Sequence, residues 1–546
     1  MIRKNLAINS FVDSEAATAK SGSEAESRQF SSQRFWKLWQ WWLAPALLAL
    51  GLVLFFVDPF IGDWDGMDYT ILSLVGYPSS MALGRNLFIF ENHTLFVIAN
   101  WVFGTSTEHA YLLFKYSVVL QSPLAIIAVW ILARDLTRSV FTATIAALFL
   151  VFSPVFVLYA GQVMTDVPSV LLLAIALTIH LRGVKRNNLT LILAGAALLG
   201  LGVNLRESGG FYAPWLVLAP IACGWKLRGR QLAQIATSCA VFAFFAFAWF
   251  AYWFISDPHY RWIWFGWRES MSEESSRHPV ALHNIGPFLM YLFVAAPVIF
   301  ATLPFAPIIE WRRNRFSPLL ALWIVGLFAD VLLFFNYSTA VNWRYFLTGL
   351  PGLAPLAAQG LLTVVERIVR TKQRAFITSA MLIAVLAVVF SIYMRPVSRE
   401  FIERRAMSKE YRERLTKVPD NAVLISGSQT IAVTYWASIG TGHWKTIGTG
   451  GGWPGRRIFA VIEDYLSEGR PVFLDTDRRW WLPCGWQREE IPLLTELDDH
   501  FRFRRVTETI YELRPLNDAA AKDDPQLDRL LPENRPEDTR KCPPGR

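Results

Sequence analysis

Residues 139–159 read SVFTATIAALFLVFSPVFVLY, a run of 21 residues without a charged side chain. A helix rises about 1.5 Å per residue, so about 20 apolar residues cross a hydrocarbon layer about 30 Å thick. Arg134 and Arg138 precede the run, and Asp166 follows it. The stretch therefore predicts a membrane-spanning helix that begins beside basic residues and ends near an acidic one.

The rest of the chain repeats this pattern. Hydrophobic residues make up 53% of the 546 residues and charged residues only 18%, which is typical of multi-span membrane proteins. We predict a polytopic α-helical membrane protein with about eleven spans of this length. They are expected at 43–60, 110–133, 139–159, 165–181, 189–204, 211–224, 232–255, 287–309, 318–335, 345–365 and 375–394. The span at 211–224 is short and contains two prolines.

Basic residues predict the orientation, because Lys and Arg favour the cytoplasmic side. One set of connecting segments carries fifteen of them, whereas the opposite, longer set carries six. The fifteen are Arg134, Arg138, Arg182, Lys185, Arg186, Lys226, Arg228, Arg230, Arg312, Arg313, Arg315, Arg367, Arg370, Lys372 and Arg374; the six are Arg85, Arg206, Arg261, Arg268, Arg277 and Arg344. We therefore expect a multi-pass protein of the cell inner (plasma) membrane with a cytoplasmic N-terminus. The net charge of +9 follows from this bias, and no nucleic-acid motif is present.

Composition divides the chain into four parts. We predict a cytoplasmic polar tail at 1–40, a transmembrane domain at 41–394, a small extracytoplasmic α/β domain at 395–515 and a disordered tail at 516–546. In the α/β part, strand-like runs at 422–426 and 471–475 flank a helical stretch at 456–467. The glycine-rich run 448–452 lacks the Lys-Ser/Thr of a phosphate-binding loop, so a flexible loop is favoured over a phosphate site. Cys484 and Cys542 lie on the predicted oxidising side, where pairing stays open.

An acidic turn, DWDGMDY at 63–69, follows the first predicted span. Ionised carboxylates are costly in hydrocarbon, so Asp63, Asp65 and Asp68 mark a segment at an aqueous rim. Other ionisable residues also fall at the outer ends of the spans. They are Glu91, His93, Lys115, Asp166, Arg206, Glu207, Asp330 and Arg344. One outer cavity lined by acids and bases explains this distribution, whereas an ion pathway needs such groups at mid-depth.

Each of these residues also has an ordinary structural interpretation. Asp166 precedes Pro168 at the start of a predicted helix, where an acid acts as an N-cap. Arg206 and Arg344 are long enough to extend toward lipid headgroups. The aromatic residues of the predicted 256–286 loop favour an interfacial belt over a sugar-stacking platform.

The order of the motifs resembles the GT-C superfamily of membrane glycosyltransferases, especially protein O-mannosyltransferases and the lipid A aminoarabinose transferase. DGMDY at 65–69 stands in place of that family's Asp-Glu-x-x-Tyr motif, with Gly66 where the family has Glu. ENHTLFVIANWVFG at 91–104 resembles its loop-helix segment but lacks the Lys-Pro-Pro. Asp166 with Pro168, NLRE at 204–207, and NWRYFL at 342–347 with Pro351 follow in the family's order. The resemblance covers about residues 40–395.

The resemblance implies a glycosyltransferase that moves a hexosyl or pentosyl group from a polyprenyl-phosphate carrier to an acceptor on the outer face of the membrane, with inversion. In this interpretation Asp65 is the base, and Asp166 orients the acceptor or binds a cation. Arg206, Arg344, Tyr345 and Lys115 are the expected donor-phosphate residues, because Arg can hold two phosphate oxygens. Asp63, Asp68, Glu91 and His93 are further candidates.

The predicted partners are membrane lipid, the lipid-linked sugar donor and a protein, lipid or glycan acceptor. No cofactor is required by the pattern. Divalent-metal dependence stays open, with Glu91 and His93 as candidate ligands. Two other functions are weighed against the enzyme. A transporter or flippase for a lipid-linked or small polar substrate lacks support from inverted repeats, and a non-catalytic assembly protein would use the C-terminal domain for docking.

Overall fold

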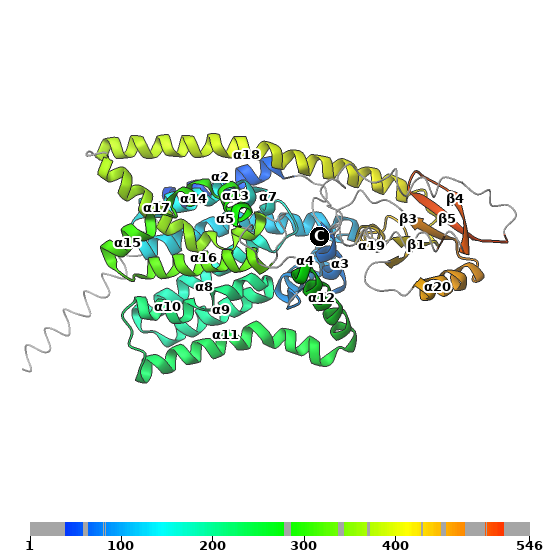
Figure 1. Cartoon of the computed structure of the whole chain (residues 1–546), viewed down its shortest axis with the longest axis horizontal. Coiled ribbons are helices and arrows are strands. Elements are labelled where there is room, and N and C mark those ends of the chain that lie inside the picture. The colour runs from blue at the N-terminus through cyan, green and yellow to red at the C-terminus, as the bar shows by residue number, and fades with distance from the viewer. Residues whose placement is uncertain are drawn as a thin grey trace, which may run out of the picture.

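The computed structural model describes residues 39–57, 64–79, 81, 83–277, 285–336, 343–368, 372–426, 430–448, 455–475, 497 and 500–517. Asp63, Cys484, Cys542 and most of the predicted terminal tails lie outside these residues, as does most of the glycine-rich run. A helical bundle occupies one end of the molecule, and a smaller unit with a β-sheet occupies the other (Figure 1).

Long apolar runs form the bundle. Its helices are α2 (Trp39–Phe56), α5 (Ala110–Thr137), α6 (Val140–Val151), α7 (Pro154–Ala160), α8 (Asp166–Arg186), α9 (Leu189–Leu205), α10 (Trp215–Ala222), α11 (Gly229–Ser256), α13 (Ile285–Ala295), α14 (Pro297–Thr302), α15 (Ala306–Asn314), α16 (Pro318–Asn336), α17 (Leu350–Ile368) and α18 (Lys372–Leu415). Within the described residues, Thr107–Thr137, Asp166–Arg186 and Gly229–Ser256 are long and apolar enough to cross a membrane. The bent pair Val140–Val151 and Pro154–Ala160 raises this number to four, and further apolar helices are shorter. The helices fit a multi-pass membrane protein, whereas the count of about eleven spans stays a prediction.

Prolines explain where the helices differ from the expected spans. The expected span at 139–159 bends by 67° between α6 and α7, where Pro154 begins the second helix and the Ser153 hydroxyl accepts a hydrogen bond from the Phe156 amide. The expected span at 287–309 is three helices, interrupted before Pro297 and around Pro304. Proline lacks the amide hydrogen that would continue the helical ladder, so these sites favour the end of a helix.

Glycines let the central helices approach closely. α8 packs along α9, and α9 also packs against α11. A Cβ atom on Gly195 of α9 would lie 2.5 Å from the His180 backbone nitrogen of α8, and one on Gly200 would lie 2.5 Å from the Phe242 carbonyl oxygen of α11. Backbone atoms cannot move aside as a flexible side chain can, so these contacts require glycine.

Gly195→Ala is therefore expected to push α8 and α9 apart and to destabilise the bundle by about 1–3 kcal/mol, the usual cost of overpacking. Gly202→Ala in the same helix is the matched control, because its new Cβ would meet only Leu172 Cδ2 at 3.9 Å. Thermal unfolding of the two purified variants in detergent measures the difference. Equal melting temperatures would contradict the packing argument.

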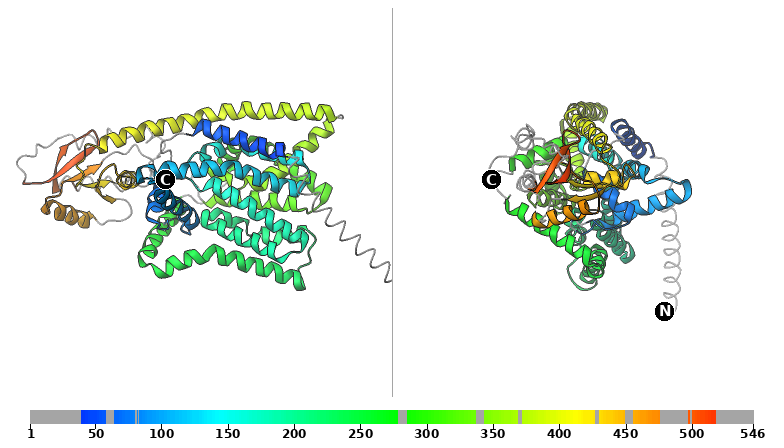
Figure 2. Two further views of the ribbon diagram at one scale, coloured as in Figure 1. Left: turned by 180° about the vertical axis from the view of Figure 1, so that it is seen from behind. Right: turned by 90° about the vertical axis from the view of Figure 1, so that its right-hand side faces the viewer.

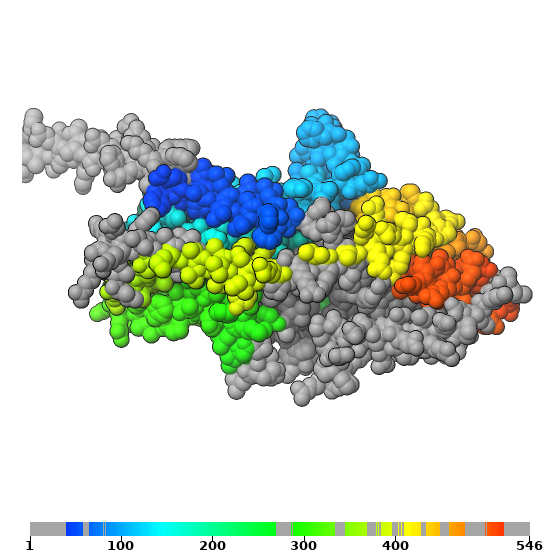
Figure 3. Space-filling view, turned by 90° about the horizontal axis from the view of Figure 1, so that it is seen from above, coloured from blue at the N-terminus to red at the C-terminus, as the bar shows by residue number. Residues whose placement is uncertain are grey.

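Further helical elements gather at one end of the bundle, which is the outer end in the predicted topology. They are α3 (Trp64–Val75), α4 (Asn86–Phe103), η1 (Thr107–His109), η2 (Glu207–Tyr212), α12 (Pro258–Arg277) and η4 (Trp343–Leu347). Helix α4 projects sideways from the body (Figure 3), and its tip exposes Trp101 and Phe103 by 85% and 81%. The predicted 256–286 loop is helical over α12. Pro258 starts this helix, and the Asp257 carboxylate accepts the His259 amide hydrogen at 2.8 Å.

Helix α18 runs along the bundle and continues to the α/β unit, with α2 beside it in the bundle (Figure 2). The unit contains β1 (Val423–Ser426), α19 (Thr430–Ser438), β2 (Lys445–Gly448), α20 (Gly455–Ser467), β3 (Val472–Asp475), β4 (Phe501–Arg505) and β5 (Ile510–Pro515). The strand order is β2-β1-β3-β5-β4. β1 pairs in parallel with β2 and β3, with Val423 opposite Lys445 and Val472, and the other pairs are antiparallel. The location of the whole α/β unit outside the membrane stays a prediction.

Candidate active site

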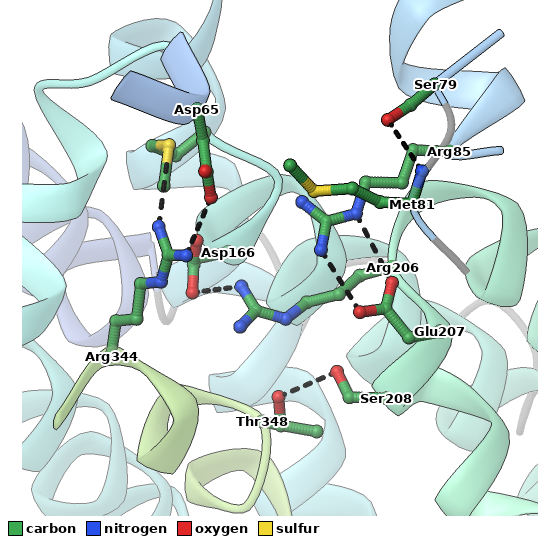
Figure 4. A network of polar contacts seen from close by, with 11 residues as sticks. Asp65, Ser79, Met81, Arg85, Asp166, Arg206, Glu207, Ser208, Arg344 and Thr348 are labelled. Atoms are coloured by element: carbon green, nitrogen blue, oxygen red, sulfur yellow. Dashed lines mark hydrogen bonds and ion pairs between the residues drawn. The ribbon is translucent and has the colours of Figure 1, made fainter. Parts of the chain in front are cut away.

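Six charged side chains meet at the outer end of the bundle, and we call them the charged cluster (Figure 4). Acids and bases alternate in it, and they come from segments far apart in the sequence. The members are Asp65 of α3, Arg85 before α4, Asp166 at the start of α8, Arg206 at the end of α9, Glu207 of η2 and Arg344 of η4. The cluster carries three acids and three bases, so its charges balance when all are ionised.

The first pair joins two residues predicted for different roles. Arg344 donates a hydrogen bond from Nη2 to Asp65 Oδ2 at 2.7 Å, and both side chains are largely buried. Arg344 also lies near Met164 Sδ at 3.8 Å. The rings of Tyr159 and Tyr345 are centred 5.9 and 5.5 Å from its guanidinium carbon. Arg344 is therefore held in a pocket, whereas the alternative interpretation extends it to lipid headgroups.

The second pair is the most deeply buried. Arg206 and Asp166 form an ion pair, with side chains only 3% and 1% exposed. The Tyr345 ring centre lies 5.3 Å from the Arg206 guanidinium carbon, so Tyr345 lies against both arginines. Thr165 occupies the N-cap position of α8, and Asp166 is the first residue of the helix. The interpretation of Asp166 as an N-cap is therefore wrong.

The third pair was given no catalytic or binding role from the sequence, although Glu207 was expected to line the outer cavity. Arg85 contacts both oxygens of Glu207, from Nη2 to Oε1 at 3.1 Å and from Nε to Oε2 at 3.3 Å. Arg85 has a φ of 46° and follows Gly84, whose φ is 92°. A Cβ on Gly84 would also approach the Tyr260 hydroxyl to 2.9 Å. The signal in the sequence is that Arg85 is one of six bases in outer segments that are otherwise poor in them.

The arginines decide the ionisation of two of these acids. Burial by itself would raise the pKa of Asp65, but the charges of Arg344, Arg85 and Arg206 and the hydrogen bond from Arg344 outweigh it and lower the pKa. Burial likewise opposes ionisation of Glu207, yet Arg85 and Arg206 lower its pKa to about 2. A pKa below the unfolded value means that the Arg85–Glu207 pair stabilises the fold above about pH 4 and loses this effect as the pH falls toward 2.

Asp68 behaves in the opposite way. Burial and the neighbouring charge of Asp65 raise the pKa of Asp68 to about 7, and Arg85 only partly offsets them. Asp68 lies three residues after Asp65 in α3, so both face the same side of the helix. Helix α3 therefore carries one ionised carboxylate, Asp65, and, one turn away, a second carboxyl group that titrates near neutral pH.

The other predicted residues have contacts outside the six side chains of the charged cluster. Lys115 of α5 is fully buried, with its Nζ 5.2 Å from the centre of the Tyr111 ring. Glu91 accepts a hydrogen bond from Gln121 Nε2 at 2.6 Å, and His93 Nδ1 lies 2.8 Å from the Ser73 carbonyl oxygen. In the part of the chain that the structure describes, no group of three or more His, Cys, Asp or Glu is placed to hold a metal ion. Asp63 lies outside the described residues.

Neutral hydrogen bonds tie the two arginine-bearing segments together. The Ser208 and Thr348 hydroxyls lie 3.0 Å apart, and the Tyr212 hydroxyl donates to the Thr348 carbonyl oxygen at 2.9 Å. Ser208 and Tyr212 belong to η2, which follows Arg206, and Thr348 follows η4, which contains Arg344. These bonds fix η2 and η4 relative to each other. The spacing of the two guanidinium groups is therefore built into the fold.

Comparison with known proteins supports the resemblance inferred from the motifs. The model of the family described as dolichyl-phosphate-mannose-protein mannosyltransferase matches residues 96–253, which include Lys115, Asp166 and Arg206. The structure is similar to that of ArnT from Cupriavidus metallidurans bound to undecaprenyl phosphate, with a TM-score of 0.55 and 14% sequence identity. This match covers 86% of the present chain and 97% of that chain. A search of curated protein sequences gave no significant match. The predicted resemblance to GT-C membrane glycosyltransferases is confirmed.

Proposed function

We propose that this protein is a glycosyltransferase that moves a sugar from a polyprenyl-phosphate carrier to an acceptor at the outer face of the cell's inner (plasma) membrane. The observation that carries the proposal is the charged cluster, in which the Arg206 and Arg344 guanidinium carbons lie 5.3 and 5.5 Å from the centre of one tyrosine ring and Arg344 bonds the carboxylate of Asp65. Similarity to a family that uses dolichyl-phosphate-mannose, and to a fold bound to undecaprenyl phosphate in ArnT, supports this donor class.

In the proposed reaction the donor phosphate binds Arg206 and Arg344. Each guanidinium presents several N–H donors in one plane, which suits two oxygens of a phosphodiester. Tyr345 packs against both arginines, and Asp166 holds Arg206 in place. Arg85 stays paired with Glu207, since Arg85 bonds both carboxylate oxygens.

Donor binding also activates the base. Before the donor binds, Asp65 accepts a hydrogen bond from Arg344. The charge of Arg344 is the largest influence that lowers the pKa of Asp65. When Arg344 turns to the phosphate, Asp65 loses that influence while remaining buried, so its pKa rises. A carboxylate with a raised pKa accepts a proton more readily. The base is therefore weak until the donor is in place.

The chemical step then follows. The acceptor hydroxyl oxygen attacks the anomeric carbon from the face opposite the phosphate, and its proton passes to Asp65. The bond from the anomeric carbon to the phosphate oxygen breaks, and polyprenyl phosphate leaves with the bonding electrons. Arg206 and Arg344 stabilise the negative charge that develops on the leaving phosphate. Attack opposite the leaving group inverts the anomeric carbon.

Transfer of labelled sugar from the polyprenyl-phosphate pool of cell membranes tests this proposal. Membranes that contain the protein should transfer the labelled sugar to an acceptor. The enzymes that digest the labelled product then show whether the acceptor is a protein, a lipid or a glycan. Sealed vesicles that accumulate or flip a lipid-linked substrate without labelling any acceptor would instead favour a transporter and contradict the proposal.

The titration of Asp68 predicts how the KM for the donor depends on pH. Ionisation of Asp68 as the pH rises through about 7 adds a negative charge beside the site of the donor phosphate. The KM for the donor should therefore increase from the acidic to the alkaline side of this pH. In Asp68→Asn the inflection should disappear, because the amide cannot ionise. Donor KM is measured across the range for both proteins, and an inflection that persists in the variant would contradict the assignment.

A further inference from the structure

The α/β unit contacts the helix that carries the proposed base. Helix α19 of this unit packs against α3, and the two lie side by side between the sheet and the bundle (Figure 1). A pair of aromatic side chains is buried beside this contact. Tyr435 of α19 is 2% exposed, and its ring meets the Tyr111 ring of α5 edge to face, with centres 6.0 Å apart.

Tyr111 connects this contact to the candidate site. Its side chain is 3% exposed, and its hydroxyl lies 3.4 Å from Gln162 Oε1. A Cβ built on Gly66 would lie 3.6 Å from the Tyr111 hydroxyl oxygen and 3.4 Å from the Val163 carbonyl oxygen. The first turn of α3 therefore rests on Tyr111 immediately beside Asp65. The Lys115 ammonium lies over the same ring.

The α/β unit is itself held firmly to α18, so α19 is a fixed support. The Tyr411 hydroxyl of α18 donates to Asp475 Oδ2 of β3 at 2.5 Å. Arg414 Nη1 donates to the Thr509 hydroxyl at 3.1 Å. The Arg412 guanidinium carbon lies 5.0 Å from the centre of the Trp436 ring of α19. These contacts join the long helix to the sheet and to α19.

We infer that Tyr435 of the α/β unit is a positioning residue for the proposed reaction, because it fixes Tyr111 and thereby the turn of α3 that directs Asp65. In this inference the α/β unit supports the turn of α3 that carries the base. This inference rests on the proposed function for its catalytic consequence, whereas the packing of Tyr435 on Tyr111 and of α19 on α3 is independent of it.

The test compares three variants of the full-length protein. Tyr435→Ala removes the ring, and Tyr435→Phe keeps it. Phe503→Ala truncates an aromatic side chain of similar burial in β4, within the sheet core and away from α3. Phe503→Ala therefore controls for general weakening of the α/β unit.

Hydrogen–deuterium exchange measures the effect of these changes on the packing of α3 directly. In Tyr435→Ala the amides of residues 64–75 should exchange faster than in the native protein, because α3 loses its support. Tyr435→Phe and Phe503→Ala should leave exchange in α3 unchanged. Native-like exchange of α3 in Tyr435→Ala would overturn the inference, whatever the activity assay gives.

Steady-state kinetics measure the effect of these changes on the transfer reaction. Tyr435→Ala should lower kcat by about 10- to 100-fold, since small displacements of a reacting group have effects of this size. The KM for the donor should stay near the native value, because Arg206 and Arg344 are held by Asp166, Asp65 and Tyr345. An equal loss in Tyr435→Ala and Phe503→Ala would overturn the positioning role. Absence of transfer by the native protein would overturn the proposed function alone.

Discussion

Asp65→Asn is expected to lower kcat by about 10²- to 10⁴-fold, the usual contribution of a positioned general base. The amide has the same shape as the carboxylate but cannot take the acceptor proton. Its oxygen still accepts the Arg344 hydrogen bond, and loss of the Asp65 charge frees Arg344 for the donor phosphate. Donor KM should therefore stay the same or fall. Steady-state kinetics with labelled donor measures both quantities.

Asp257→Asn is the matched control for this change. Asp257 is another acid at the same end of the bundle, but it accepts a hydrogen bond from the Tyr77 hydroxyl at 2.6 Å and is not a member of the charged cluster. Its substitution should leave kcat near the native value. If Asp65→Asn retained native kcat, Asp65 would be removed from the mechanism.

Substitution of Arg206, the partner of Asp166, is expected to have the second large effect, on both stability and transfer. Arg206→Gln leaves the Asp166 charge buried without its partner, which should destabilise the protein by about 3–5 kcal/mol. Adding Asp166→Asn removes that charge and should restore much of the melting temperature. Transfer should stay at least about 100-fold below native in the double variant, because the donor phosphate still lacks one cation.

The Arg182–Asp135 pair provides the comparison for the double variant. It joins the same residue types in the region predicted to face the cytoplasm. Arg182→Gln with Asp135→Asn should leave transfer unchanged. Thermal unfolding in detergent and transfer are measured on the same preparations. Recovery of both stability and transfer by Arg206→Gln with Asp166→Asn would show that Arg206 has a structural role only.

Much of the bundle could be predicted from the sequence, because apolar runs specify helices locally. The runs at 110–133 and 232–255 lie within α5 and α11. Helix breaks were harder to predict. The run at 287–309 is apolar throughout, and its prolines could have been tolerated as in many membrane helices. Only the packing of α13, α14 and α15 decides that they are separate.

Residue types at the outer rim were also predictable, but their pairing was not. Arg344 and Asp65 are 279 positions apart in the sequence, and no local pattern links them. Arg85 was counted only as a base in an outer segment, since its bond to Glu207 depends on the backbone at Gly84. Helix α12 was expected as a loop because its sequence has no clear apolar stripe, and its packing on α11 is a tertiary effect.

The central claim is that the charged cluster uses a lipid-linked sugar as its donor. The most direct measurement incubates purified full-length protein with polyprenyl-phosphate sugar and native membranes as the source of acceptor, and follows the release of free polyprenyl phosphate. The account predicts release by the native protein and its loss in Asp65→Asn and in the Arg206→Gln, Asp166→Asn double variant. Consumption of a nucleotide sugar in place of the lipid-linked donor, or equal release by native and variant proteins, would contradict it.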